Sequence, residues 1–552
     1  MDDITTTTET VPQTNDLLQK LADKLRWADL DAKAEKSRSL VIIKGQVQKK
    51  EIKIDGKAVT SLQEMPVKYL GKKYTSDLGE KQQIDLIEQQ LKSDLKKIDK
   101  CKLPGRYKCW IVQHMLLLIL MWPLNIYNVP MYKIEVMQRK ITVALKRWLR
   151  IPKSFSSDCL YSRSSKLRLP FTSLSEEVKS AKARNLITLE TSKDNCIRNA
   201  GIKVDGGRKA NTPAEVQDAK SRLQMKEITG IARGREGLGM RRRQYYSTSS
   251  KIERRDMVVD TIREREEEQR LVKMTSLVSQ GVNLKWEVPQ RYLKDKDVMK
   301  MPEASLSFLI KAVYDLLPTP ANRNKWFGSE ERCLLCGQEG TLNHLLSGCK
   351  VALSQGRYKW RHDKVLKELS YHLQQRMTEN LKSPEATSRK IQFVKEGEKG
   401  EQQERSTGNY LSSAKDWKMA VDLDRKLQIP REVSTTNLRP DITIISRRTK
   451  QFGMIELTVP SEERIEVSGE LKRLKYEKIA QEAKVNGWQV KIWAVEVGCK
   501  GFPAASLGNL LKDLGFKGGQ RKKTSEAIGK AAEQASYSLW KARFFKDWGP
   551  KR

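Results

Sequence analysis

The spacing of hydrophobic residues predicts that most of the first 200 residues are helical. Leucines recur on one face between residues 14 and 30, and helical spacing resumes near residue 78 and continues to about residue 200. Three prolines are expected to interrupt this second stretch, namely Pro104, Pro123 and Pro152. Between the two helical stretches, short apolar segments predict strands at residues 40–43, 52–59 and 68–70.

The rest of the chain changes its pattern several times. Residues 201–255 are rich in Gly, Lys, Arg and Ser without sustained periodicity, which indicates a linker or an arm that becomes ordered on binding. A highly charged helix is expected over residues 252–277, and its charge run at 263–268 is interpreted as a solvated face. The later patterns predict an apolar helix at 303–317, a strand–strand–helix–strand series at 438–500 and a docking helix at 524–548.

Composition adds a candidate partner. The chain has 105 Lys and Arg against 68 Asp and Glu, a formal net charge of +37 over 552 residues. This surplus favours a polyanionic partner, because phosphate contacts release condensed counterions and give affinity for any sequence. Ribosomal and membrane-surface proteins share such a balance, so charge alone does not decide between these classes.

The sequence predicts a soluble intracellular protein. The start of the chain, Met1 to Ile4 followed by a threonine run, resembles neither a secretory signal nor a transit peptide. The most apolar stretch, residues 115–121, is shorter than the roughly 20 residues of a membrane span and predicts a buried helix. Eight cysteines in so long a chain do not indicate a disulfide scaffold, which favours a reducing compartment.

A cysteine–histidine motif gives the sharpest local signal. Its ligands are spaced Cys333-x2-Cys336-x7-His344-x4-Cys349. A Cys-x-x-Cys turn directs two thiolates at one ion, and a His and a Cys from the next turn complete a tetrahedron, which predicts a structural Zn²⁺ site. The alternative is four reduced core residues that are close in sequence by chance.

Aromatic and cationic residues alternate directly after this motif. Arg357, Tyr358, Trp360 and Arg361 are candidates for nucleic-acid binding, because aromatic rings stack on bases and cations contact phosphates. The start of an amphipathic helix with a packed Trp explains each of these residues equally well.

Two carboxylates and a lysine define a second candidate site. Asp441 and Glu456 lie on adjoining predicted strands, so a hairpin brings both to one edge, where hard oxygen ligands can hold Mg²⁺ or Mn²⁺. In the helix that follows, Leu471, Leu474 and Ile479 are expected to face the sheet, which places Lys475 and Lys478 near its boundary. The alternative is a surface unit whose carboxylates end strands by chance.

These blocks, in this order, resemble the proteins of non-LTR retrotransposons of the restriction-like-endonuclease class. The resemblance covers nearly the whole chain and rests on Met1-Asp2-Asp3, Lys36-Ser37-Arg38-Ser39-Leu40, Pro66 to Gly71, Leu103-Pro104-Gly105, Trp122-Pro123-Leu124, Lys146 to Leu149, Phe308 to Pro320, the Cys-Cys-His-Cys motif, Arg439-Pro440-Asp441, Glu456 and Lys475-Tyr476.

The resemblance implies a multidomain chain, mainly α with α+β parts. It would hold a partial reverse-transcriptase palm, a helical thumb, a small zinc module and an α/β restriction-like endonuclease domain. The segments are residues 1–77, palm remnant; 78–200, thumb; 201–325, basic linker and helices; 326–370, zinc module; 371–430, helical connector; 431–505, endonuclease; 506–552, C-terminal helix and basic tail.

The resemblance also implies roles for single residues. Asp441 and Glu456 would bind the nuclease metal, and Lys475, with Lys472 or Lys478 as alternatives, would orient water or stabilise charge. Thr458 stands where the nuclease motif would have lysine, so the lysine is expected from the later helix.

A polymerase site is implied in part. Asp2 and Asp3 would be polymerase metal ligands, and Lys68 lies in the segment similar to the primer grip. In such proteins the nuclease nicks target DNA and the polymerase copies element RNA from the freed end, so DNA and RNA are the expected partners. The nucleus is the expected location, with the cytoplasm as a second one.

The competing interpretation is a non-catalytic nucleic-acid-binding relic, or a binder recruited by the host. The intact Arg439-Pro440-Asp441 and Glu456 favour the enzyme, whereas the missing palm strand and fingers favour the relic.

We predict that this chain alone has no reverse-transcriptase activity, because the palm strand that bears the remaining polymerase carboxylate is missing. The measurement is incorporation of labelled nucleotide on a primed RNA template, and incorporation above background would contradict the prediction.

Overall fold

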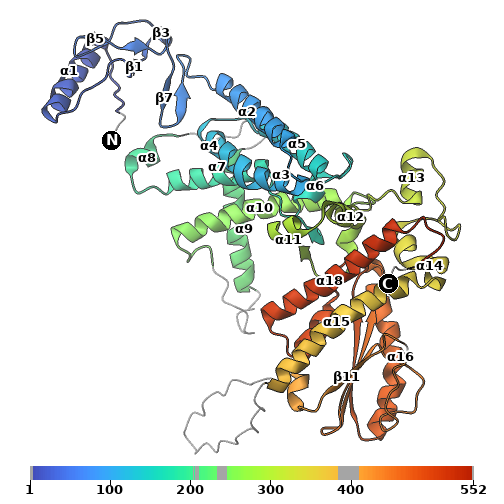
Figure 1. Cartoon of the computed structure of the whole chain (residues 1–552). Helices are drawn as coiled ribbons and strands as arrows, with labels where there is room; N and C mark the ends of the chain where they lie inside the picture. Colours follow the sequence, from blue (N-terminus) through green and yellow to red (C-terminus); the bar gives the residue numbers. More distant parts are fainter. Residues whose placement is uncertain are drawn as a thin grey trace, which may run out of the picture. The chain divides into compact units, whose positions relative to one another are not determined.

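The structure, a computed structural model, describes residues 4–202, 204, 211–232, 245–382, 409–424 and 426–549. They belong to two compact units, one of residues 1–148 and 172–266, the other of residues 149–171 and 267–552. Helices dominate both units and the sheets are small (Figure 1), which confirms the prediction of a mainly α chain with α+β parts. Residues 149–171, inside the predicted thumb segment, are part of the second unit.

The first unit opens with a helix and small sheets. Thr10 caps α1 (Val11–Trp27) by accepting a hydrogen bond from the Gln13 amide, and Ala22 of this helix packs on Ile52 and Ile54. Eight short strands pair two by two; each of the three predicted apolar segments overlaps at least one of them, and the strands outside those segments were not predicted. They are β1 (Arg38–Ser39), β2 (Val41–Ile43), β3 (Gln46–Gln48), β4 (Lys53–Ile54), β5 (Lys57–Ala58), β6 (Thr60–Ser61), β7 (Val67–Tyr69) and β8 (Lys72–Tyr74).

The rest of the first unit is helical. Its elements are α2 (Lys81–Lys100), α3 (Gly105–Ile111), the π-helical turn η1 (Val112–Leu116), α4 (Leu117–Ile126), α5 (Met131–Trp148), α7 (Leu174–Glu190), α8 (Asn195–Asn199), α9 (Thr212–Ala232) and α10 (Lys251–Thr275), the last of which continues into the second unit.

Helix α9 corrects the prediction of a linker over residues 201–255. Val216 and Ala219 of α9 are buried against Leu186 of α7 and Val259 of α10. The apolar face of α9 is narrow and includes a small alanine, so tertiary packing rather than a strong periodic signal stabilises this helix.

The apolar stretch at residues 115–121 also differs from its prediction. It lies inside one continuous helical run, Gly105–Ile126, which by length and composition alone is long and apolar enough to cross a membrane. The prediction considered only consecutive apolar residues, whereas the helical run also includes polar positions. Pro123 lies inside α4 and does not end it. One face of the run packs in the unit, whereas Leu118 and Ile119 are exposed.

The second unit contains the candidate sites. Its elements are α6 (Ser157–Tyr161), β9 (Leu167–Arg168), η3 (Val282–Lys285), β10 (Arg291–Tyr292), α11 (Asp295–Lys300), α12 (Glu303–Val313), α13 (Pro320–Phe327), η4 (His344–Gly348), α14 (Lys350–Ser354), α15 (Arg357–Lys382), η5 (Tyr410–Ser413), β11 (Lys418–Val421), β12 (Ile442–Ser446), β13 (Gln451–Thr458), η6 (Glu462–Arg464), α16 (Ile465–Val485), β14 (Gln489–Glu496), α17 (Ala505–Asp513) and α18 (Gly518–Lys541).

A four-stranded sheet, ordered β11-β12-β13-β14, forms the core of this unit. β11, β12 and β13 are antiparallel neighbours, and α16 is the crossover to β14, which runs parallel to β13. The series β12, β13, α16, β14 confirms the pattern predicted for residues 438–500. The edge strand β11 was missed inside the predicted helical connector, because it is short and half exposed.

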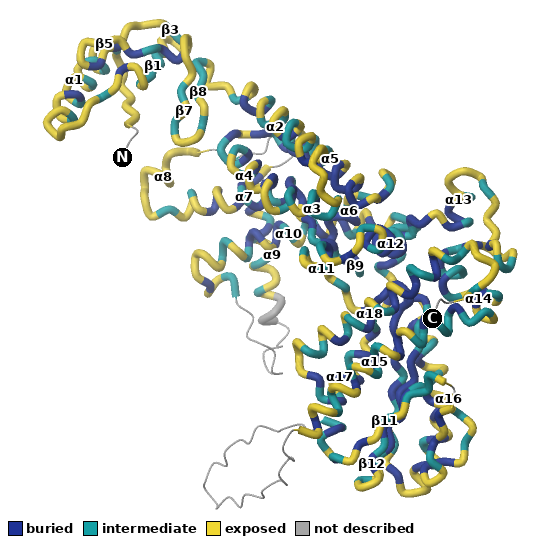
Figure 2. The backbone as a smooth tube through the Cα atoms, in the orientation of Figure 1, coloured by how far each residue is buried: buried dark blue, intermediate teal, exposed yellow. Residues whose placement is uncertain are grey.

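Both faces of the sheet are covered. Ile455 and Leu457 of β13 face α15, α17 and α18, whereas Phe452 and Met454 face α16, as the two-residue period of a strand requires. α15 and α18 run side by side in Figure 1, and Figure 2 shows the central strands as buried. The stripe predicted for the last helix is confirmed, because Ile528 of α18 is fully buried in this core.

The charge run of α10 is not a solvated face throughout. Glu267 is buried, and its Oε1 accepts hydrogen bonds from the Ser162 hydroxyl and from the backbone amides of Arg163 and Ser164. Burial raises the pKa of Glu267, but these hydrogen bonds outweigh burial and leave it below its ordinary value. The charged residue therefore anchors the loop after α6.

We predict that Glu267→Ala lowers the free energy of unfolding by about 2–4 kcal/mol, because two backbone amides and a hydroxyl lose their acceptor. The measurement is urea unfolding at neutral pH. The matched control is Glu264→Ala, which removes an exposed ion pair with Lys226 and should cost at most about 1 kcal/mol. Equal losses for the two variants would contradict the prediction.

Candidate functional site

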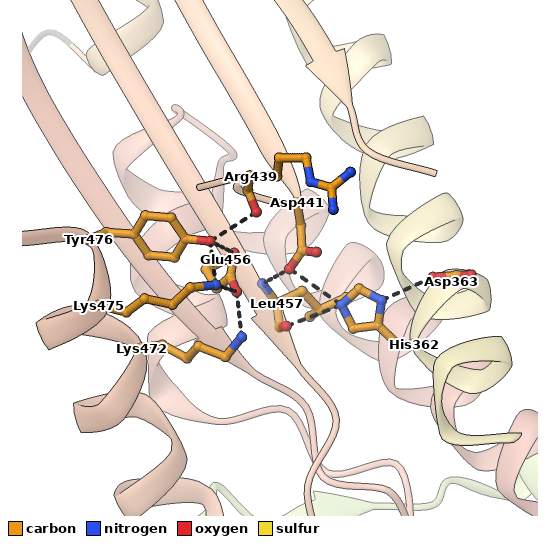
Figure 3. Close-up of polar contacts among 9 residues, drawn as sticks. All are labelled: His362, Asp363, Arg439, Asp441, Glu456, Leu457, Lys472, Lys475 and Tyr476. Atoms are coloured by element: carbon orange, nitrogen blue, oxygen red, sulfur yellow. Dashed lines mark hydrogen bonds and ion pairs between the residues drawn. The ribbon is translucent and has the colours of Figure 1, made fainter. Parts of the chain in front are cut away.

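The two candidate carboxylates lie at one edge of the sheet. The antiparallel ladder of β12 and β13 pairs Ile442 with Ile455, so Asp441 lies opposite Glu456 one step beyond that pair. Residues opposite each other in an antiparallel pair share a face of the sheet. The hairpin therefore places Asp441 and Glu456 together, as the sequence predicted, and Figure 3 shows the groups that surround them.

Glu456 is buried and surrounded by donors from α16. Its Oε1 pairs with the Lys472 ammonium and lies 3.6 Å from Lys475 Nζ, and its Oε2 lies 2.9 Å from the Tyr476 hydroxyl. That hydroxyl also lies 2.9 Å from the Arg439 carbonyl and accepts a hydrogen bond from Lys475 Nζ. Burial and the nearby carboxylate raise the pKa of Tyr476, so the phenol keeps its proton.

The structure refines the choice of lysine. Lys472 makes the direct ion pair with Glu456, Lys475 lies at the outer limit of an ion pair and contacts the Tyr476 ring, and Lys478 is exposed. Lys472 and Lys475 therefore both reach the carboxylate edge. Tyr476, for which the sequence predicted no role, is a third group at the site.

The predicted orientation of α16 is wrong in part. Leu471 and Leu474 are 64% and 67% exposed, whereas Tyr476, Ile479 and Ala483 face the sheet. The sheet-facing positions follow the spacing i, i+3, i+7, which a search for leucines alone does not find.

His362 of α15 contacts Asp441 from the opposite side of the edge (Figure 3). Its Nε2 lies 3.3 Å from Asp441 Oδ2 and 3.2 Å from the Leu457 carbonyl, and its Nδ1 lies 3.2 Å from Asp363 Oδ1. The Leu457 amide donates to the same Asp441 Oδ2 at 2.7 Å. Burial disfavours the imidazolium, but hydrogen bonds to Asp363 and Asp441 outweigh this and raise the pKa of His362 to about 9.

Both ring nitrogens of His362 therefore face acceptors, and the charged imidazolium can donate to each side. No sequence motif predicts a role for this residue. Its position in a basic, aromatic stretch gave no signal, because its partner Asp441 is distant in sequence and meets it only through the packing of α15 on the sheet.

The four residues of the cysteine–histidine motif come together. The Sγ atoms of Cys333, Cys336 and Cys349 and a ring nitrogen of His344 all lie within 4.8 Å of one another, and Cys336 Sγ is 3.1 Å from His344 Nε2. A tetrahedral zinc site with Zn–S bonds of about 2.3 Å needs donors about 3.8 Å apart, so this donor set could hold Zn²⁺.

The chemistry of these donors suits a cation. Burial lowers the pKa of His344, which favours the neutral imidazole that a metal requires. Burial raises the pKa of the Cys349 thiol to about 11, a cost that zinc offsets by stabilising the thiolate. The Tyr358 hydroxyl accepts a hydrogen bond from the Cys349 amide and lies 3.1 Å from the His344 and Leu345 carbonyls. It therefore stabilises the segment of residues 333–349 that carries the four donors, called the metal loop below.

Arg361 joins the metal loop to the sheet. It is 2% exposed, and its guanidinium donates to the Leu346 carbonyl of the loop, to the Val459 carbonyl after β13 and to the Ser536 hydroxyl of α18. A side chain so enclosed cannot contact phosphate. The nucleic-acid role predicted for Arg361 is therefore corrected to a structural one.

The neighbouring candidates are also engaged inside the protein. Arg357 is 2% exposed and donates to the carbonyls of Ala542 and Phe545, so its predicted nucleic-acid role is corrected in the same way. Trp360 is partly buried and packs edge-on against Trp548, with ring centroids 5.5 Å apart. These residues are therefore better described as the packed start of an amphipathic helix than as a free binding surface.

A buried ion pair forms a second link between the loop and the sheet. Lys500 Nζ lies 3.0 Å from Glu462 Oε2 and 3.3 Å from Asn343 Oδ1 of the metal loop. Glu462 follows β13 and Lys500 follows β14. The cysteine–histidine module is therefore an integral part of the second unit.

Of the remaining predicted residues, the structure describes Lys68 alone. Lys68 is exposed on β7. Asp2 and Asp3 lie outside the described residues.

Comparison of the sequence with protein-family models and with curated protein sequences finds no match. The function must therefore be argued from the residues of the two sites.

We predict one zinc ion per chain after native purification, measured by elemental analysis, because the four donors lie within the span of one tetrahedral ion. Cys336→Ser should abolish it. The matched control is Cys196→Ser, which changes an exposed cysteine outside the motif and should leave the zinc content unchanged. Zinc retained by Cys336→Ser, or absent from the native chain, would contradict the assignment.

Proposed function

We propose that this chain binds nucleic acid and nicks DNA with a divalent cation held by Asp441 and Glu456. In this proposal it is part of a retrotransposon protein of the restriction-like-endonuclease class. The observation that carries the proposal is the position of Asp441 opposite Glu456 at one sheet edge, with two lysines of α16 beside them. A mixed sheet with helices on both faces supports it, since the edge is held on a rigid element.

Bound Mg²⁺ or Mn²⁺ would lower the pKa of a water molecule and stabilise charge on the phosphate. Asp441 and Glu456 provide the hard oxygen atoms that such a cation prefers. Lys472 and Lys475 place two ammonium groups at the same edge, where they attract the scissile phosphate and neutralise its charge. Tyr476 contacts both Glu456 Oε2 and Lys475 Nζ, so it aligns the carboxylate with the lysine.

The net charge of +37 supports DNA and RNA as the partners of the whole chain. Because Arg357 and Arg361 are buried, this binding must use cations other than these two arginines. With DNA as the target, the proposed location is the nucleus, with the cytoplasm as a second location.

A non-catalytic binder is the second candidate function. The observation that favours it is that Lys472 and Tyr476 already occupy both oxygens of Glu456. If Glu456 bound a cation, it would have to exchange at least one of these partners. In a non-catalytic protein with the same fold, it would keep both.

We predict that the chain nicks supercoiled plasmid in Mg²⁺ or Mn²⁺, and that Asp441→Asn and Glu456→Gln each slow nicking at least about 100-fold. Such a loss corresponds to about 3 kcal/mol of barrier, as expected when a metal ligand is removed. The matched controls are Asp424→Asn and Glu477→Gln, which change exposed carboxylates that make no contact with Asp441 or Glu456 in the described part of the chain and should nick at the native rate.

The same plasmid is used in a gel-shift assay. If the native chain shifts DNA but does not nick it, the binder replaces the nuclease as the proposed function. If nicking persists in Asp441→Asn and Glu456→Gln, the assignment of these carboxylates is wrong.

A further inference from the structure

His362 lies at the junction of two rigid elements. It follows Arg361 on α15, and the buried Arg361 guanidinium fixes this turn of the helix to the metal loop, to the end of β13 and to α18. The backbone position of His362 is therefore set by contacts of Arg361 and does not depend on the contact between His362 and Asp441. From that position its Nε2 reaches Asp441 Oδ2 and the Leu457 carbonyl.

The contacts of Asp441 are unequal for its two oxygens. Oδ2 accepts a hydrogen bond from the Leu457 amide of the neighbouring strand β13, and it also contacts His362 Nε2 of α15. Among the described residues, no hydrogen bond to Oδ1 is present. Two donors on one oxygen hold the plane of the carboxylate, and the second oxygen keeps its lone pairs for another ligand.

The imidazole is itself oriented from its far side. Nδ1 lies 3.2 Å from Asp363 Oδ1, so the ring is held at both nitrogens between two carboxylates. This arrangement resembles the outer contacts of metal sites in general, where mutating a partner that orients a ligand costs about 10–100-fold in metal affinity.

We infer that His362 is a positioning residue for Asp441, which it holds so that Oδ1 faces a divalent cation. The inference rests on the proposed nicking function and adds a residue to it. His362 touches neither the cation nor the phosphate in this role. It acts through Asp441, so its loss should weaken metal binding more than it weakens the fold or the binding of DNA.

Two substitutions separate the two nitrogens of the ring. His362→Gln keeps a donor near the place of Nε2 and can still hold Asp441, whereas His362→Asn keeps a donor near the place of Nδ1 and loses that contact. The matched control is His372→Gln on the same helix, where the imidazole pairs with Glu368 instead.

The experiment measures nicking by the full chain as a function of Mn²⁺ concentration at saturating plasmid and constant pH. His362→Ala and His362→Asn should raise the Mn²⁺ concentration for half-maximal nicking by about 10–100-fold. His362→Gln should stay near the native value, and His372→Gln should equal it. Mn²⁺ binding followed by electron paramagnetic resonance should show the same order of affinities, with zinc content and the gel shift unchanged.

The outcomes distinguish the two proposals. If the native chain nicks and Asp441→Asn does not, but His362→Asn keeps the native Mn²⁺ dependence, the positioning role is wrong and the nuclease stands. If the native chain does not nick, both fall. If His362→Ala loses its zinc, the pair His362→Gln and His362→Asn decides, since both replacements are polar and similar in size.

Discussion

The buried guanidinium of Arg361 is the interaction on which the second unit depends. Removing a cation from water is costly, and burial lowers the pKa of Arg361. The cost is offset because carbonyl and hydroxyl groups from the metal loop, the end of β13 and α18 accept its hydrogen bonds. These acceptors must keep their positions, so one side chain locks the metal loop and α15 to the sheet.

The need to compensate a buried charge also determines the partners at the carboxylate edge. Burial of Glu456 requires partners, which Lys472, Lys475 and Tyr476 supply from α16. Asp441 has its partner on α15 instead. The edge is thus held from both faces of the sheet, and each carboxylate has a basic partner. In the proposed nuclease, the ammonium groups and a bound cation would share the charge of the phosphate.

Much of the fold of the second unit could be predicted from local pattern. Alternation and helical spacing identified β12, β13, α16, β14 and the buried stripe of α18, because their periods reflect which face is buried. Local pattern did not predict elements whose apolar face is narrow, or a charged residue that is buried. α9 and β11 have weak apolar faces, and Glu267 is a buried anion that only the amides of a distant loop make stable.

The sequence by itself determined the cluster of three cysteines and a histidine that could hold zinc, and the pair of Asp441 and Glu456, since their spacing within a short segment limits how they can meet. It also determined the surplus of positive charge. Only the tertiary structure decided that Arg357 and Arg361 are buried, that Lys472 joins Lys475, and that His362 holds Asp441. The physical reason is that a local period specifies which face of an element is buried, whereas the packing of distant elements selects the partner that each face meets.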